Sequence, residues 1–157
     1  MSQISSDRAL CALAYTLCTL KNAGPCTGVR FSTLIQPAED DFSLDGSTIR
    51  IQAPGVYLIR YSLFLPEGCA LDSMFSVQAN TEALLSSVVH VLRRPADPGA
   101  TYSAQALAHF DTPARVLLIS SAPLDIRDRC ASTAASVSFL RVGEAGSSGF
   151  HSLPPEI

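Results

Sequence analysis

Tryptophan is absent from the 157 residues, and tyrosine occurs only four times. Exposed aromatic rings are the usual platform for a sugar, so the supply for a carbohydrate site is poor. Only one of the eleven basic residues is a lysine, Lys21, and the formal net charge is −3. Because nucleic-acid binding requires clustered Lys and Arg, this composition argues against a nucleic-acid surface.

Motifs that carry catalysis or hold a metal are also missing. The five cysteines contain no C-x-x-C pair, and none of the three histidines belongs to an H-x-H pair, so the spacing of zinc ribbons and redox pairs is absent. The sequence has no G-x-S-x-G, no P-loop and no G-x-G-x-x-G. It therefore predicts a protein that is not an enzyme, with no catalytic, cofactor-binding or metal-binding residues.

No apolar run is long enough to cross a bilayer. The longest near the start, ALCALAYTLCTL at 9–20, falls short of the roughly 20 residues that a spanning helix needs. Neither a charged leader nor a small-residue cleavage site accompanies it, so we expect no signal peptide and no membrane insertion.

Charge is scarce throughout the chain. Only 16% of the residues are charged, against about 25% in an average soluble domain, while 47% are hydrophobic. A single domain of this size has a large surface that must be kept wet. We therefore expect the chain to oligomerise or to pack against another apolar surface.

The cysteines fall into two groups. Cys11 and Cys18 lie within the apolar run and are interpreted as buried, inert thiols. Cys26 and Cys69 neighbour turn residues, in GPCTG and PEGCA, so we expect exposed thiols able to crosslink neighbouring molecules in an oxidising environment.

Proline and glycine punctuate the chain at short intervals, and the runs between them are rich in Val, Ile, Leu, Phe, Tyr, Ser and Thr. This rhythm predicts an all-β sandwich or barrel. The first run would also serve as a buried helix, but we favour a strand there. Strands are expected at 9–20, 29–36, 47–52, 55–65, 73–80, 84–92, 101–110, 114–121 and 133–142.

Alternation in two of these runs predicts one buried face. Strand 73–80 places Phe75 among apolar residues on one face and polar residues on the other. Strand 101–110 likewise gathers Tyr102 and Phe110 on an apolar face.

Strand 55–65 is apolar on both faces. One face carries Tyr57, Ile59, Tyr61 and Leu63. The other carries Val56, Leu58 and Phe64, with Arg60 in the middle. A strand with one wet face alternates more cleanly, so we predict that the second face is covered too, by another sheet or by another copy of the chain.

An unpaired buried guanidinium is costly, so we expect Arg60 to meet a carboxylate or a carbonyl where this second face is covered. Strand 133–142 is similarly apolar on both faces, because Phe139 and Leu140 lie on opposite faces.

Two further polar sites, at His90 and at Arg93–Arg94, are interpreted as structural and not as functional. His90 is interpreted as a core or interface histidine, and the pair Arg93–Arg94 as a solvated loop before a proline.

Four short motifs follow one another along the sequence in a recognisable order. They are Pro54-Gly55-x-Tyr57-x-Ile59-x-Tyr61, the F-x-V-x-x-N from Phe75 to Asn80, the A-x-x-x-F from Ala106 to Phe110, and the S-x-S-F-L-R-V ending at Val142. Together they resemble the C-terminal domain of BclA-type collagen-like exosporium glycoproteins, over residues from about 9 to 142. That domain belongs to the jelly-roll superfamily shared with tumour necrosis factor (TNF) and the complement globular head. The sequence departs from this pattern in two ways. It contains no collagen-like Gly-X-Y run, and its five cysteines are not part of the pattern.

The resemblance implies a TNF-like jelly-roll β-sandwich that assembles as a homotrimer, its protomers packing apolar faces around a three-fold axis. We expect one domain at 1–142 and a flexible tail at 143–157. Candidates for the core or the trimer interface are Tyr57, Ile59, Arg60, Tyr61, Leu63, Phe75, Tyr102, Phe110, Phe139 and Leu140.

The expected function is that of a non-enzymatic structural or display head on an extracellular bacterial surface or spore surface (exosporium), with adhesion as a further role. Loops 66–72, 93–101 and 122–132 would carry contacts to a surface glycan or a protein ligand. The alternative is a lectin-like, carbohydrate-binding jelly-roll module.

Overall fold

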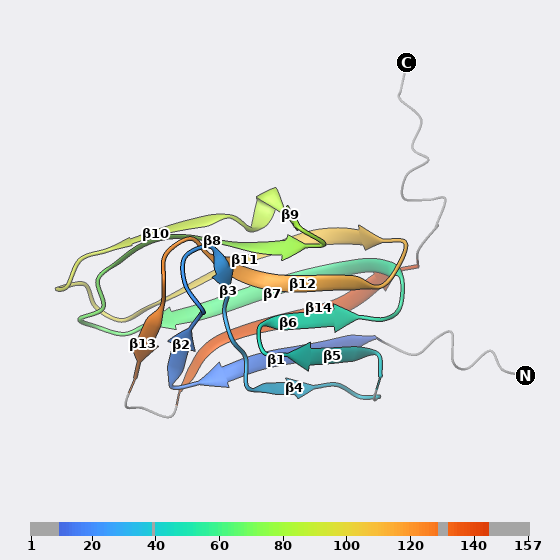
Figure 1. Ribbon diagram of the computed structural model, residues 1–157, viewed down its shortest axis with the longest axis horizontal. Coiled ribbons are helices and arrows are strands. Elements are labelled where there is room, and N and C mark those ends of the chain that lie inside the picture. Colours follow the sequence, from blue (N-terminus) through green and yellow to red (C-terminus); the bar gives the residue numbers. More distant parts are fainter. Residues whose placement is uncertain (1–9, 39, 129–131, 145–157) are drawn as a thin grey trace, which may run out of the picture.

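Residues 10–38, 40–128 and 132–144 are described by the structure, a computed structural model (Figure 1). Within these ranges the chain forms strands and a single turn of 3₁₀ helix, η2 (Leu85–Ser87). The strands are β1 (Cys11–Leu17), β2 (Thr19–Lys21), β3 (Thr27–Gly28), β4 (Thr33–Ile35), β5 (Phe42–Asp45), β6 (Thr48–Ile51), β7 (Gly55–Leu65), β8 (Leu71–Ala79), β9 (Glu82–Ala83), β10 (Val89–Arg93), β11 (Ala100–Phe110), β12 (Ala114–Ser120), β13 (Asp125–Arg127) and β14 (Thr133–Gly143). The all-β prediction is confirmed.

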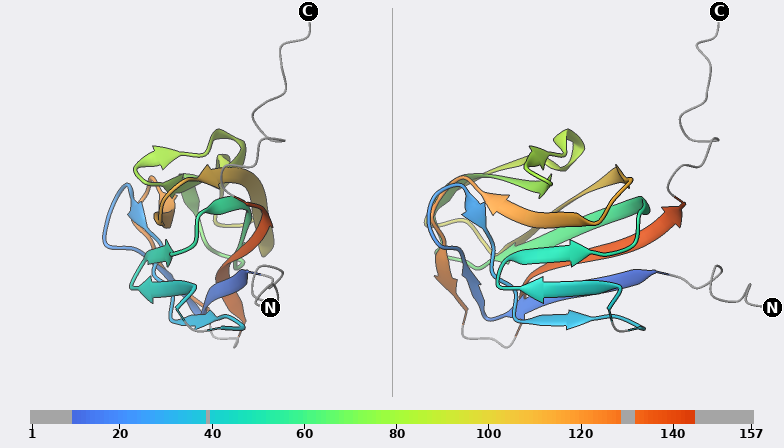
Figure 2. Two further views of the ribbon diagram at one scale, coloured as in Figure 1. Left: turned by 90° about the vertical axis from the view of Figure 1, so that its right-hand side faces the viewer. Right: turned by 45° about the vertical axis from the view of Figure 1, so that its right-hand side comes forward.

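Two antiparallel sheets lie face to face as a sandwich (Figure 2). The five-stranded sheet has the order β11-β7-β14-β1-β4. The seven-stranded sheet has the order β10-β8-β12-β6-β5, with β3 paired to β12 and β9 paired to β8. A small two-stranded sheet joins β13 to β2. Most neighbouring strands are distant in sequence, as Greek-key and jelly-roll connections require.

Strand β7 is central because both of its edges are hydrogen-bonded along nearly its whole length. It pairs with β11 from Gly55 to Leu65 and with β14 on its other side. At its start, Pro54-Gly55 allows β14 to approach closely: a Cβ on Gly55 would lie 2.9 Å from the carbonyl oxygen of Gly143. A larger residue would therefore push these two strands apart.

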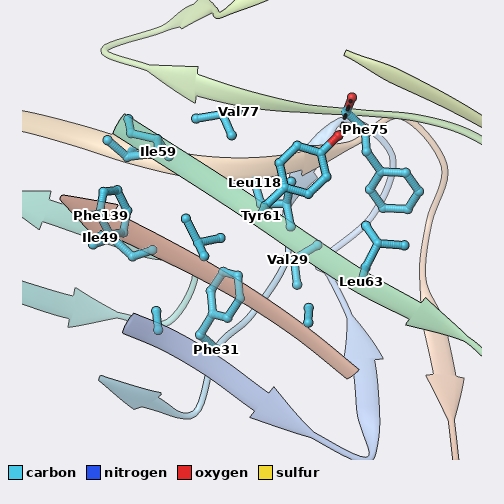
Figure 3. Close-up of a cluster of buried hydrophobic side chains, with 14 of the residues drawn as sticks. Val29, Phe31, Ile49, Ile59, Tyr61, Leu63, Phe75, Val77, Leu118 and Phe139 are labelled. Carbon is cyan, nitrogen blue, oxygen red and sulfur yellow. Dashed lines mark hydrogen bonds between the residues drawn. The ribbon is translucent and has the colours of Figure 1, made fainter. Parts of the chain in front are cut away.

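The core lies between the two sheets. Every second residue of β7 is buried and points toward β8 and β12, as Figure 3 shows for Ile59, Tyr61 and Leu63. The predicted apolar faces of strands 73–80 and 101–110 are confirmed, because their alternate apolar residues are buried or half-buried. Seven of the residues predicted for the core or interface lie in this core: Tyr57, Ile59, Tyr61, Leu63, Phe75, Phe110 and Phe139.

Both core tyrosines have hydrogen-bonded hydroxyl groups. The Tyr61 hydroxyl donates to the Ser87 carbonyl at 2.7 Å and also lies 3.4 Å from the Phe75 carbonyl oxygen (Figure 3). The Tyr57 hydroxyl donates to the Ala53 carbonyl at 2.7 Å. Tyr61 thus links β7 to the opposite sheet, which an apolar ring alone would not do.

The first apolar run is extended, so the helix alternative is wrong, but it is not one strand. Cys18 has a φ of 64° and divides the run into β1, in the five-stranded sheet, and β2, which pairs with β13. Residues other than glycine rarely adopt this left-handed backbone conformation, so the alternation of apolar residues could not indicate that the strand breaks at Cys18. Residues 145–157, most of the expected tail, lie outside the described part of the chain.

Other predicted boundaries differ where turns interrupt an apolar run. The predicted strand 29–36 is reduced to β4, and the start of 84–92 is the 3₁₀ turn η2. Strands β5 and β13 were missed because they are short and carry polar residues. Asn80 and Thr81, with φ values of 50° and 76°, form the tight turn between β8 and β9.

We expect Tyr61→Phe to lower the free energy of unfolding by about 1–3 kcal/mol, because the buried Ser87 carbonyl loses its side-chain donor. Urea unfolding followed by circular dichroism measures this change. Tyr15→Phe is the matched control: the Tyr15 side chain is half-buried, and its hydroxyl has no hydrogen bond within the described ranges. Equal stability of the two variants would contradict the proposed link between the sheets.

Stability should also fall steeply at alkaline pH. Burial raises the pKa of Tyr61 from 10.0 to about 12, and burial raises the pKa of Tyr57 as well. The unfolded chain releases these protons first, so this contribution is complete below pH 10 and is lost as the pH rises toward 12. Denaturant midpoints measured from pH 9 to 12 should decline less steeply for Tyr61→Phe than for the native sequence.

Candidate functional site: an open sheet face and a clasped loop end

One face of the five-stranded sheet carries exposed apolar residues, and η2 contacts it at the β11 edge. We call this outward surface of β11, β7, β14 and β1 the open face. Leu107, Leu140 and Val142 are 58%, 44% and 48% exposed there. The strand register brings Leu107, Leu58, Leu140 and Cys11 into one line across four strands, which we call the apolar row.

A shallow hollow of about 560 Å³ lies at the β11 end of the apolar row. Its lining is formed by Leu58, Ser86, Gln105, Ala106, Leu107 and Val142. The Ser86 hydroxyl donates to the Gln105 carbonyl at 3.2 Å, which holds η2 against the edge of the sheet. The hollow is mainly apolar, so it suits a side chain of another protein molecule better than a charged ligand.

Arg60 lies next to the apolar row and is exposed in the single chain. Its Nε and Nη2 atoms donate to Gln105 Oε1 at 3.3 and 3.0 Å. Within the described ranges it has no carboxylate partner. A neutral amide thus orients the guanidinium, and the carboxylate or carbonyl expected at a contact between copies stays a prediction.

The structure separates the ten predicted core or interface residues. Arg60 and Leu140 belong to the open face, Tyr102 is half-buried, and the others form the core. Leu107 and Val142 also belong to the open face, but they were not among the ten predicted residues. Each lies on the opposite face of its strand from the buried residues. The signal that could have identified them is an apolar residue on the second face of a strand.

The interpretation of the pair Arg93–Arg94 as a solvated loop is wrong for Arg93. It ends β10 and is only 4% exposed, whereas Arg94 is exposed as expected. The guanidinium of Arg93 donates to the carbonyls of Pro66, Cys69, Asp97 and Pro98, at 2.8 to 3.4 Å, and to the Tyr102 hydroxyl at 3.1 Å. Buried charge is tolerated here because all of its nitrogens have acceptors.

These hydrogen bonds tie two loops together. Residues 66–70 connect β7 to β8, and residues 94–99 connect β10 to β11. The second loop is also closed by Asp97, whose carboxylate accepts from the Arg94 N–H at 2.8 Å. Two of the loops expected to carry contacts therefore form a single clasped end of the sandwich.

The thiols differ in environment. Cys26 is exposed as expected, while Cys69 is half-buried beside Arg93. Burial raises the pKa of the Cys69 thiol, and the Arg93 charge offsets part of this rise. Cys69 is therefore a weaker nucleophile than an exposed cysteine. Cys11 and Cys18 are half-buried, and Cys130 lies outside the described ranges.

His90 was expected in the core or an interface. Its side chain is 51% exposed, so the core position is wrong and the interface position stays a prediction. It lies on the outer surface of β10, where its Nε2 is 2.7 Å from Asp72 Oδ1 on β8. Alternation places Val91, not His90, in the core.

Among the described residues no group of three or more His, Cys, Asp or Glu side chains could hold a metal ion. The described part of the chain also contains no helix able to span a bilayer.

No family model and no curated protein matches the sequence. Solved structures nevertheless share its fold. The crystal structure of murine APRIL at pH 5.0 is similar with a TM-score of 0.59 and 10% identity, over 86% of this chain and 100% of that one. The structure of Eiger TNF from S. frugiperda is similar with a TM-score of 0.60 and 13% identity, over 88% and 96%.

Identities this low establish the fold alone. The chain is an all-β sandwich of the TNF-like jelly-roll type, as the sequence motifs implied. The closer relationship to BclA-type domains stays a prediction.

We expect Arg93→Lys to destabilise the protein by at least about 2 kcal/mol, because an ammonium group cannot reach the separate acceptors that the guanidinium fork reaches. Arg94→Lys is the control and should change stability by less than about 0.5 kcal/mol. Urea unfolding provides both values.

The same variant should make Cys69 react faster with a thiol reagent, since its loop is released. Mass spectrometry of partially labelled protein locates the label. An unchanged labelling rate at Cys69 would show that Arg93 does not hold this loop.

Proposed function

We propose that the chain is a non-enzymatic head domain that assembles as a homotrimer through its open face. The observation that carries this proposal is the apolar row, together with the exposed Val142 beside it. Contiguous exposed apolar surface on a soluble domain marks an interaction site. The TNF-like fold and the scarcity of charge in the sequence support a second copy as the occupant.

The distribution of apolar side chains favours a ring over a face-to-face dimer. Leu107 and the 83% exposed Leu85 lie at the β11 edge, while Ile35, 53% exposed, lies on β4 at the opposite edge of the same sheet. Two different patches on one subunit make a heterologous contact, which forms a ring when its rotation closes. A trimer would bury all of these side chains.

The arrangement of the loops supports a display role. Leu65 of β7 pairs with Ala100 at one end of the sheet, beside the clasped loops. At the other end Val56 pairs with Gly143, and Cys11 of β1 lies near it through its pairing with Leu140. The chain thus enters and leaves the sandwich at the end opposite the loops (Figure 1).

A head attached through either chain end would therefore present residues 66–70 and 94–99 outward. Three copies of a weak binding loop on one face gain affinity by avidity without a deep pocket. The proposed location is outside the cell, on a bacterial or spore surface, with adhesion to a glycan or protein as the proposed role. The motifs shared with BclA-type domains are the support for the spore surface.

The lectin-like alternative is less well supported. Tyr57 and Tyr61 are fully buried, and Tyr102 is half-buried and bonded to Arg93. Few aromatic rings are left to stack on a sugar.

Leu140→Glu should dissociate the trimer, because three carboxylates would be buried in the contact. Light scattering at micromolar concentration should give a mass near three times 16.6 kDa for the native chain and near 16.6 kDa for the variant. Leu92→Glu is the matched control: Leu92 is 67% exposed on the other sheet, so its variant should stay trimeric.

Circular dichroism checks that both variants are folded. A native chain that is monomeric at this concentration would overturn the proposal.

A further inference from the structure

Two arginines stand directly opposite each other on the outer surface of the seven-stranded sheet. Arg50 of β6 is the register partner of Arg115 of β12, strands that Figure 1 shows side by side. Their neighbours Ile51 and Ala114 are buried, so alternation directs both arginine side chains to solvent.

This pairing is unfavourable unless something lies between the two charges. Side chains directly opposite on antiparallel strands have Cβ atoms about 5 Å apart, and like charges there are destabilising. Within the described ranges neither guanidinium has a hydrogen bond or an ion pair. Arg115 is held only through its backbone, whose N–H donates to Asn80 Oδ1 at 2.9 Å.

The two arginines also share a hollow. A depression of about 200 Å³ is lined by Arg50, Gln52, Pro113, Ala114 and Arg115. The Gln52 backbone N–H donates to the Asp41 carbonyl at 3.0 Å, while the Gln52 side-chain amide has no hydrogen bond within the described ranges. Pro113 forms a rigid wall at the start of β12.

We propose that this hollow is a binding site for a doubly charged tetrahedral oxyanion, a phosphate or sulfate group. Two facing cations are neutralised by one dianion, and each guanidinium fork matches two of its oxygens. Gln52 contributes a neutral donor at the rim. The same contacts fit the free ion or an ester of it.

Two carboxylates lie on adjoining segments. Asp111 is 3.3 Å from His109 Nε2, and Asp41 is half-buried and immediately precedes β5, where its carbonyl faces Gln52. Neither forms an ion pair with Arg50 or Arg115. The site lies on the sheet opposite the open face, so it does not depend on the proposed trimer.

Titration calorimetry with inorganic phosphate, at constant ionic strength and pH 7.5, tests the proposal. We expect saturable binding to the native chain, weakened roughly tenfold or more by Arg50→Gln and by Arg115→Gln. Arg94→Gln removes an exposed arginine elsewhere and should leave the affinity unchanged. Acetate, a monoanion, should bind at least tenfold more weakly; equal affinity for acetate would overturn the assignment of a dianion.

Phenyl phosphate distinguishes the two sources. Tighter binding than inorganic phosphate identifies an ester as the ligand, and weaker binding identifies the free ion; both support the site. Absence of saturable heat with phosphate, sulfate and phenyl phosphate would overturn it.

Thermal unfolding gives an independent measurement. Phosphate should raise the midpoint of the native chain and of Arg94→Gln, but not that of either site variant. Without phosphate, Arg115→Gln should be at least as stable as the native chain, because the facing charges are gone. An equal rise in all four proteins would show a general salt effect and would sink the proposal.

Discussion

The fold depends on the register of β7 between β11 and β14. Because side chains alternate across a strand, a slip of one residue would turn Arg60 and Ser62 into the core and expel Tyr57, Ile59 and Tyr61. Among the described residues no carboxylate is buried that could compensate the charge of Arg60 in the core. The arginine in the middle of an apolar strand therefore helps to define a single register. That register in turn positions Tyr61 to bond the Ser87 carbonyl and hold the second sheet.

The open face is a consequence of the same pairing. Once the inner residues of β7 and β14 are committed to the core, Leu58 and Leu140 must point outward and line up with Leu107. One sheet thus supplies both a core wall and an association surface. The loops at the Leu65 end are free of this constraint, and Arg93 orders them through carbonyl oxygens instead of through apolar packing. Rigid loops at one end and an apolar face along the side are compatible with a head that both assembles and presents contacts.

Three described arginine sites differ in environment. Arg93 is buried and saturated with acceptors, Arg60 is exposed and bound to Gln105, and Arg50 faces Arg115 with no acceptor among the described residues. Nothing in their local sequence distinguishes these cases. Most acceptors of Arg93 come from two loops that the strands bring together. The local sequence around Arg93–Arg94 does not contain this information, so it predicted a solvated arginine where the structure has a buried one. The core position expected for His90 was wrong for a simpler reason: its sequence neighbours are apolar, but His90 itself occupies an outward position of its strand.

Period-two alternation of apolar residues, interrupted by Pro and Gly, was sufficient to determine the all-β class, the bounds of β7 and β11 within a residue, and most of the core. These features are local, because each depends on which way neighbouring side chains point. The break at Cys18, the clasp around Arg93 and the alignment of the apolar row were decided only by tertiary structure. Each depends on which distant strands become neighbours, and pairing between strands leaves no signal within either strand alone.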